Sequence, residues 1–176
     1  HIMVGPDVWM DTDSNPDFIE DLSLYRSWKE QAAAEGLRVR IGRWNVPGKP
    51  TAILVDFKQF LTRQNEILTE FWKRFGVDSL TGNWDYRESA LFGYAAGRVI
   101  ESFYKFNLES SDKVVAQFHE WMTGTGLLYL KSVNVPIATV FTTHATVIGR
   151  CIAGNYLPLY DGIHGYDADE KARHFN

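Results

Sequence analysis

The segment from Val114 to Arg150 constrains the fold more than any other part of the sequence. Its hydrophobic pattern predicts a strand over 114–118, a helix over 121–131 and a second strand over 136–141. A strand, a helix and a strand in this order favour two parallel neighbours joined by a right-handed crossover. The carboxyl ends of the two strands then meet at one edge of the sheet, where open α/β sheets bind their ligands.

A histidine follows each of these two predicted strands. We expect His119 and His144 to emerge side by side at the sheet edge. Each histidine taken alone could simply donate a hydrogen bond to a loop carbonyl. A pair at neighbouring strand ends favours a binding site instead. The helix that opens after His119 adds backbone N–H groups that suit sugar hydroxyls or phosphate oxygens.

The composition limits what such a site could serve. With 176 residues, 45% hydrophobic and 14% aromatic, the chain is long and apolar enough for one domain with its own core. Its 18 basic and 22 acidic residues give a net charge of −4 without a basic stripe, which argues against nucleic acid as a partner. No stretch approaches the roughly 20 apolar residues of a membrane span. The single cysteine, Cys151, excludes an internal disulfide and favours a cytoplasmic location.

Periodicity and turn residues predict the remaining elements. The start, Ile2 to Val4, resembles the end of a strand, so we expect the sequence to be cut from a longer protein. The alternation around Arg38 and Arg40 predicts a strand with both arginines in solvent, paired with a following strand in a hairpin. The other expected elements are helices over 17–23, 24–35, 65–75, 86–106 and 145–153, a strand over 52–55, loops over 7–15, 76–85 and 157–166, and a truncated helix at the tail.

Two incomplete motifs exclude common site types. His119 and Glu120 begin the HExxH pattern of zinc proteases, but Thr123 stands where the second histidine must lie one helical turn later. Gly124 and Gly126 are similar to part of the dinucleotide-binding fingerprint, but its third glycine is absent. Close packing of a helix explains these two glycines better.

Five short motifs are spread along the chain. They are VGP at 4–6, IGRW at 41–44, YRESALFG at 86–93, FHEW at 118–121 and FTTHAT at 141–146, the last followed by a Gly and an Arg. Together they resemble one enzyme family, the eukaryotic type of glycogen synthase, glycosyltransferase family 3, in which they occur in the same order. The resemblance covers essentially the whole chain. Residues 79–83 and the tail after Tyr156 match the family less closely.

This resemblance implies an α/β fold, a Rossmann-like three-layer sandwich with a mainly parallel sheet. Residues 1–176 would form a single domain, an incomplete amino-terminal domain of a GT-B glycosyltransferase whose carboxyl-terminal nucleotide-binding domain is absent. The family transfers glucose from a nucleotide sugar, typically UDP-glucose, to the non-reducing end of an α-1,4-glucan. The transfer retains the configuration of the sugar and needs no metal or other cofactor.

The resemblance also assigns site residues. It places His119 against the donor glucose, with a hydrogen bond to a sugar hydroxyl and support of the charge-deficient sugar carbon through its backbone carbonyl. Glu120, Thr143 and His144 would line the same donor site. Arg150 would anchor the loop or serve the structure alone. The catalytic groups themselves are expected outside this chain.

Two alternatives to a UDP-glucose-dependent synthase stay open at the level of sequence. One is a starch or glycogen synthase that uses ADP-glucose. The other is a non-catalytic module that binds glucan on its surface aromatic residues. For a synthase that uses UDP-glucose or ADP-glucose, the expected partners are a nucleotide sugar, an α-glucan and the missing domain. A homo-oligomer is possible for the full-length protein. The isolated chain is expected to be inactive, because half of the charge-stabilising groups would be absent.

Overall fold

The computed structural model describes residues 1–8, 17–77 and 80–175 of the chain. It forms two compact units, residues 1–141 and 142–176, and each is treated by itself below. The expected loop over 7–15 lies mostly outside the described residues. Whether the two units act as a single domain stays a prediction.

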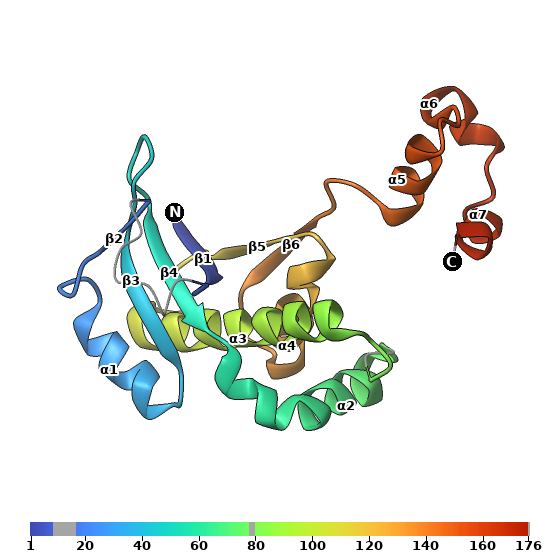
Figure 1. Cartoon of the computed structure of the whole chain (residues 1–176). Coiled ribbons are helices and arrows are strands. Elements are labelled where there is room, and N and C mark those ends of the chain that lie inside the picture. The colour runs from blue at the N-terminus through green and yellow to red at the C-terminus, as the bar shows by residue number, and fades with distance from the viewer. Residues whose placement is uncertain (9–16, 78–79, 176) are drawn as a thin grey trace. The chain divides into compact units, whose positions relative to one another are not determined.

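The first unit contains a four-stranded mixed sheet (Figure 1). Strand β1 pairs with β4 in parallel, whereas β4 with β3 and β3 with β2 are antiparallel, which gives the order β1-β4-β3-β2. The predicted hairpin between residues 37 and 55 is therefore confirmed. The strands are β1 (Ile2–Pro6), β2 (Phe18–Glu20), β3 (Arg38–Trp44) and β4 (Thr51–Asp56).

A second sheet holds β5 (Val115–His119) and β6 (Ala138–Thr142). The Ala138 N–H donates to the Val114 carbonyl at 3.0 Å, which joins the starts of the two strands. Because both strands begin at the same end, they run parallel. Helix α4 (Gly124–Val133) connects them, preceded by one 3₁₀ turn over Trp121–Thr123. The predicted strand, helix and strand are confirmed, and so is the α/β fold class.

The first unit also contains three α-helices, at the places where periodicity predicts them, and one 3₁₀ turn over 58–63 that the sequence does not predict. The N-cap Asn83 accepts a hydrogen bond from the Tyr86 amide at 3.0 Å and begins α3. Gly36 and Gly76 follow their helices with positive φ angles of 74° and 67°, a conformation that favours glycine. The segments are α1 (Arg26–Ala34), the 3₁₀ turn η1 (Lys58–Arg63), α2 (Gln64–Phe75) and α3 (Trp84–Asn107).

Helix α3 is the element shared by both sheets of the first unit. Its residues Leu91 and Val99 are buried in the main core with β3 and β4. Further along, Tyr104 joins a second cluster with Phe118 of β5 and Leu130 of α4. Figure 1 shows the helix passing along the first sheet and beside α4. The position of β5 is therefore set by one continuous helix.

The second unit is helical. It contains α5 (Val147–Gly154), α6 (Leu159–Gly162), a 3₁₀ turn η3 (Ile163–Gly165) and α7 (Ala168–Phe175). The predictions of helices over 145–153 and in the tail are confirmed. The predicted loop over 157–166 is wrong, because this segment makes two short helical turns. The Tyr166 hydroxyl donates to the Pro158 carbonyl at 3.0 Å and so joins the end of this segment to its start.

Two further predictions need correction at the edge of the first sheet. The helix expected over 17–23 is wrong, because Phe18 is buried and its strand pairs with β3. The solvated pair of arginines is wrong for Arg40. Its side chain forms an ion pair with Glu20 at 3.0 Å and lies 3.6 Å from the buried Asp7 carboxylate. Strand β2 pairs with β3 and so brings Glu20 next to Arg40. The local sequence around Arg40 does not predict this strand pairing.

The glycines of α4 serve helix packing, as the sequence predicts. A Cβ atom on Gly126 would lie 2.5 Å from the Gly93 carbonyl oxygen of α3 and 2.7 Å from the ring of Phe118. Beside this contact, the buried Thr125 hydroxyl donates to the Ala90 carbonyl at 2.7 Å. The Tyr129 hydroxyl donates to Glu101 of α3, and burial together with this carboxylate raises the pKa of Tyr129 above its ordinary value.

We predict that Gly126→Ala lowers the free energy of unfolding by about 1–3 kcal/mol, because the backbone of α3 must move to admit the methyl group. Gly154→Ala is the matched control. A Cβ there meets nothing within 4 Å, so stability should change by less than about 1 kcal/mol. Denaturant unfolding of both variants measures the difference. Equal stabilities would contradict the packing role of Gly126.

Candidate functional site

The candidate site begins at the last residue of β5. Ala116 and Phe118 are buried, whereas Val115 and His119 lie on the exposed side of the same strand. This alternation follows from the two-residue period of a strand. It leaves the His119 imidazole accessible at the carboxyl end of β5. The predicted position of this histidine is therefore confirmed, while its role stays a prediction.

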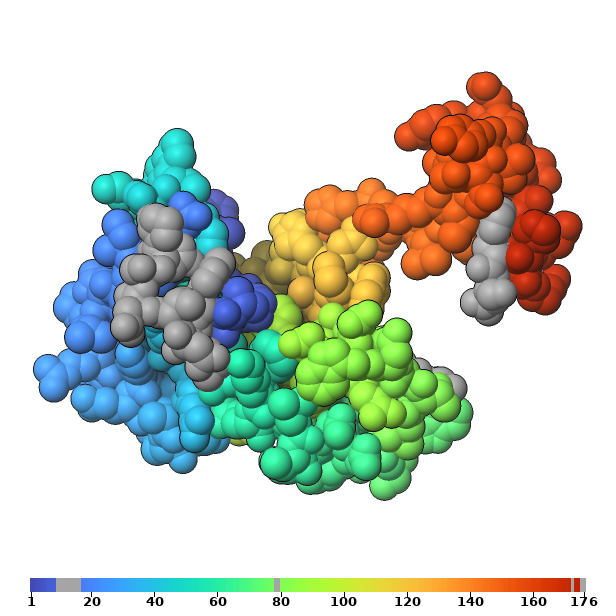
Figure 2. Space-filling view, in the orientation of Figure 1, coloured from blue at the N-terminus to red at the C-terminus, as the bar shows by residue number. Residues whose placement is uncertain are grey.

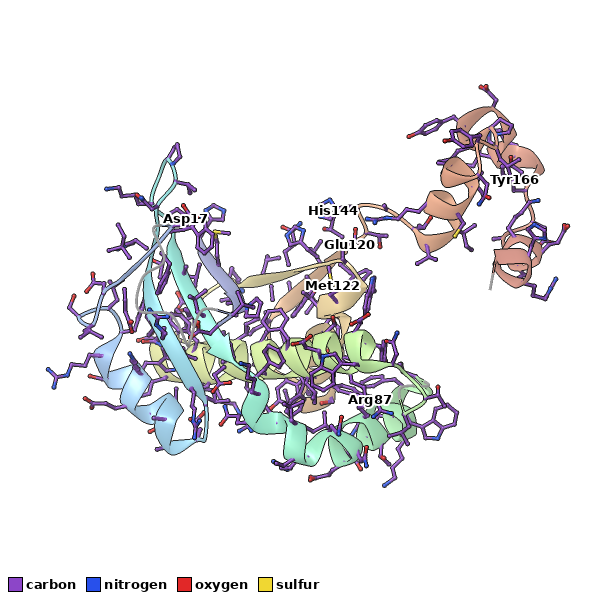
Figure 3. All side chains as sticks on the ribbon, in the orientation of Figure 1. Asp17, Arg87, Glu120, Met122, His144 and Tyr166 are labelled. Carbon is purple, nitrogen blue, oxygen red and sulfur yellow. The ribbon has the colours of Figure 1, made fainter. Side chains whose placement is uncertain are left out.

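Glu120 connects the strand to the helix through a strained backbone. Its φ is 64° and its ψ is 167°, in a region that glycine adopts readily and other residues avoid. Figure 3 labels Glu120 and Met122 at this junction. Glu120 is the single residue between β5 and the following 3₁₀ turn, so the His119 carbonyl lies at the end of the strand. Strain of this kind concentrates at functional sites, which supports a site here.

Thr123 holds the junction from the helix side. Its hydroxyl donates to the His119 carbonyl at 2.8 Å and lies 3.2 Å from the Glu120 carbonyl. Thr123 therefore fixes the orientation of a group that could face a ligand. In the sequence pattern, Thr123 serves only to exclude a zinc protease.

A signal for Thr123 was nevertheless present in the sequence. Threonine hydroxyls commonly bond a carbonyl three or four residues earlier, and His119 lies four residues before Thr123. The backbone N–H groups at the start of α4 are less accessible to a ligand than the sequence predicts. Thr125 and Gly126, in the first turn, are buried against α3.

An aromatic surface adjoins the junction. The Trp121 ring stacks on Tyr86 of α3 with an interplanar angle of 5° and a centroid distance of 6.2 Å. Trp121 is 50% exposed, so it is not the core residue that a tryptophan after a strand usually is. On the same helix, Arg87 donates to the carbonyls of Leu80 and Gly82 and fixes the preceding loop (Figure 3).

The remaining predicted site residues belong to the second unit. Thr143 and His144 precede α5 and are exposed, and Arg150 is exposed within that helix. The Thr146 hydroxyl accepts from the Gly149 amide at 3.0 Å and caps the helix. Because the two units are described separately, the prediction that these residues share a site with His119 stays a prediction. The same holds for the anchoring role of Arg150.

The described residues contain neither a candidate metal site nor a candidate membrane span. No group of three or more His, Cys, Asp or Glu side chains gathers there in a way that could hold a metal ion. None of the described helices combines the length and the apolar character needed to cross a membrane.

Fold and site together define an α/β protein whose candidate site lies at a strand-to-helix junction with a strained backbone. The family model described as glycogen synthase matches residues 2–175. The chain belongs to the glycogen synthase family, which confirms the predicted resemblance. The enzymes of this family are glycosyltransferases.

Individual relatives agree with the family match. The chain is 33% identical to the glycogen [starch] synthase of Dictyostelium discoideum over 137 residues, which cover 78% of the chain and 15% of that protein. It is 33% identical to the liver enzyme of Mus musculus over 139 residues, 78% of the chain and 19% of the relative. It is 30% identical to glycogen [starch] synthase isoform 2 of Saccharomyces cerevisiae over 144 residues, which cover 81% of the chain and 20% of that protein. The matched region thus spans about a fifth of these relatives.

We predict that Glu120→Gly is more stable than Glu120→Ala by about 1–3 kcal/mol, because only glycine relieves the backbone strain. The two variants lose the same charged side chain, so their difference isolates the backbone. At an ordinary position alanine is the more stable of the two by about 0.4–1 kcal/mol. Denaturant unfolding measures the sign. A more stable alanine variant would show that Glu120 is not strained.

Proposed function

We propose that residues 1–176 form part of a longer enzyme that transfers glucose from a nucleotide sugar to the non-reducing end of an α-1,4-glucan. Family membership and the names of the relatives, glycogen [starch] synthase, support the reaction class. The observation that carries the proposal is the junction of β5 and α4. There an accessible histidine and its carbonyl are held at a strand end by a strained residue and a hydroxyl.

His119 has two roles in this proposal. The imidazole donates a hydrogen bond to a hydroxyl of the donor glucose and orients the ring. The backbone carbonyl lies near the sugar carbon that becomes electron-deficient as the nucleotide leaves. A fixed dipole aimed at developing charge lowers the barrier because it needs no reorganisation during the reaction. The hydrogen bond from Thr123 holds this carbonyl in place.

The other assigned residues complete the donor site. Glu120, Thr143 and His144 line it, and Arg150 anchors the loop that carries the latter two. We propose UDP-glucose as the donor, retention of configuration, and a reaction without metal or other cofactor. The groups that hold the nucleotide phosphates come from a carboxyl-terminal domain. Residues 1–176 alone would then transfer no glucose. We further propose a cytoplasmic location for the enzyme.

We predict that His119→Ala in the longer enzyme lowers kcat by about 10²–10³-fold, the usual loss for one donor to a reacting group. His164→Ala is the control, because this histidine is exposed in the second unit and has no assigned role. Its kcat should stay within about twofold of the parent, since it touches no reacting group. Incorporation of labelled glucose into glycogen measures both. Unchanged activity of His119→Ala would remove this residue from the donor site.

We predict a separate effect for Thr123, a positioning residue. Thr123→Val keeps the shape of the side chain but removes the hydroxyl, so the His119 carbonyl is no longer held. We expect kcat to fall by about tenfold with KM for the donor nearly unchanged, because the interaction acts in the transition state. Thr123→Ser restores the hydroxyl and should recover most of kcat. Equal activity of Thr123→Val and the parent would contradict this role.

A second candidate is a non-catalytic glucan-binding module, which the half-exposed Trp121 favours. Binding of malto-oligosaccharide that depends on Trp121 and ignores His119→Ala would support it. An ADP-glucose-dependent enzyme is the third candidate. Comparing turnover of the two nucleotide sugars by the longer enzyme distinguishes it from the proposed function.

A further inference from the structure

A small crevice of the first unit lies between α2 and α4, over the part of α3 that carries Tyr94. Its volume is about 210 Å³, which is room for about seven water molecules at about 30 Å³ each. Figure 2 shows α2, in blue-green, at the surface of the first unit. A space of this size suits one sugar ring and is too small for a nucleotide. The crevice shares no residue with the candidate site at His119.

The floor of the crevice is aromatic. Phe71 of α2 is buried, and its ring meets the Tyr94 ring edge to face at a centroid distance of 6.2 Å. The Tyr94 ring also meets the ring of Tyr129 of α4 edge to face, at 5.1 Å. Three rings from three helices therefore hold one another in place. They give a ligand an apolar surface to lie on.

The hydroxyl groups of the two tyrosines differ in their partners. The Tyr129 hydroxyl donates to the Glu101 carboxylate. Among the described residues, the Tyr94 hydroxyl has no hydrogen-bond partner, and it is not sealed from solvent. The pKa of Arg63 is raised mainly by its hydrogen bonds to Glu66 and in smaller part by Tyr94, so the Tyr94 hydroxyl lies on the Arg63 side of the crevice. A ligand in the crevice can therefore bond to this hydroxyl.

Two ion pairs of α2 form the rim. Arg63 donates to both carboxylate oxygens of Glu66, at 2.9 and 2.6 Å. Arg74 lies 3.7 Å from the Glu70 carboxylate and donates to the Ser132 carbonyl of α4 at 3.1 Å. Glu66 and Glu70 are four residues apart on one helix, so their side chains begin about 6 Å apart. Each carboxylate keeps lone pairs for further bonds, so the two can accept from hydroxyls on opposite sides of one ring.

The charge balance of the rim indicates the class of ligand. Two arginines and two glutamates cancel, which disfavours a phosphate or another anion. A wholly apolar ligand would take these charged groups out of water without replacing their hydrogen bonds, which is costly. A neutral ligand with several hydroxyl groups suits both signs of charge, because each hydroxyl donates one hydrogen bond and accepts others. Its C–H groups can lie against the aromatic floor.

We propose that this crevice binds one neutral hexose ring. That the hexose is glucose rests on the proposed function. A free glucose molecule and a glucosyl unit of an α-glucan share the chemistry described above. When the ring belongs to a glucan, the crevice holds the polysaccharide on the enzyme and raises the local concentration of its chain ends.

The test is calorimetric titration of the longer enzyme with maltoheptaose and with glucose, in the absence of nucleotide sugar. We expect Glu70→Ala to weaken one class of binding sites about tenfold, the usual loss for one hydrogen bond to a charged group. Glu30→Ala is the matched control, because Glu30 is an exposed glutamate of α1 with the same kind of ion pair, to Arg26 at 3.4 Å. Its affinity should equal that of the parent. Equal affinities of the two variants for both sugars would overturn the proposal.

The two sugars identify the source of the ring. A loss for glucose and maltoheptaose alike shows that a free hexose is sufficient for binding. A loss for maltoheptaose alone shows that the crevice takes the ring only as part of a glucan. Both results support the site and separate its two ligands.

A second variant tests the aromatic floor with little risk to folding. Tyr94→Phe keeps the ring contacts and removes only the hydroxyl. We expect it to weaken binding about threefold or more, as the loss of one neutral hydrogen bond does. Tyr160→Phe is the control, because Tyr160 is 85% exposed in the second unit. Unchanged binding by Tyr94→Phe would also overturn the proposal.

Failure of this site and failure of the proposed function are distinguishable, because binding is measured without glucose transfer. A longer enzyme that loses binding in Glu70→Ala but transfers no glucose as the parent contradicts the proposed function alone. An enzyme that transfers glucose, and binds both sugars equally well in Glu70→Ala and in Glu30→Ala, contradicts the crevice site alone.

Discussion

The close contact between α3 and α4 is the constraint on which the candidate site depends. Gly126 and Gly93 let the two backbones approach, and the buried Thr125 hydroxyl bonds to the Ala90 carbonyl of α3 beside them. Because α4 follows β5 after one 3₁₀ turn, its position fixes where the strand must end. The strained Glu120 follows from this geometry, since the chain has a single residue in which to turn from strand to helix.

Helix α3 also contacts the rest of the first unit. Leu91 and Val99 of α3 pack on the four-stranded sheet, and Tyr104 packs with β5 and α4. Between these contacts the helix lies under the cavity that separates β1 from β5. His119 and Thr123 also line this cavity, so the candidate site lies beside it.

Elements with strong local periodicity could be predicted from sequence, and those defined by a partner could not. The apolar stripe of residues 86–106 predicts α3, and the alternation at 37–41 predicts β3. Strand β2 has three residues and exists because it pairs with β3, so its sequence alone suggested a helix. The position of His119 at the carboxyl end of β5 was predicted from the pattern of strand, helix and strand. The positive φ of Glu120 and the hydrogen bond from Thr123 depend on how β5 meets α4, which no local pattern reports.

We propose that the junction of β5 and α4 contacts the donor sugar. A structure of the longer enzyme with its nucleotide sugar bound tests this most directly. We expect the His119 side chain or carbonyl to lie about 3 Å from an atom of the glucose, within hydrogen-bond distance. Thr123 should still donate to the His119 carbonyl in that complex. Glucose bound at another place in the enzyme, with His119 exposed to water, would contradict this role of His119.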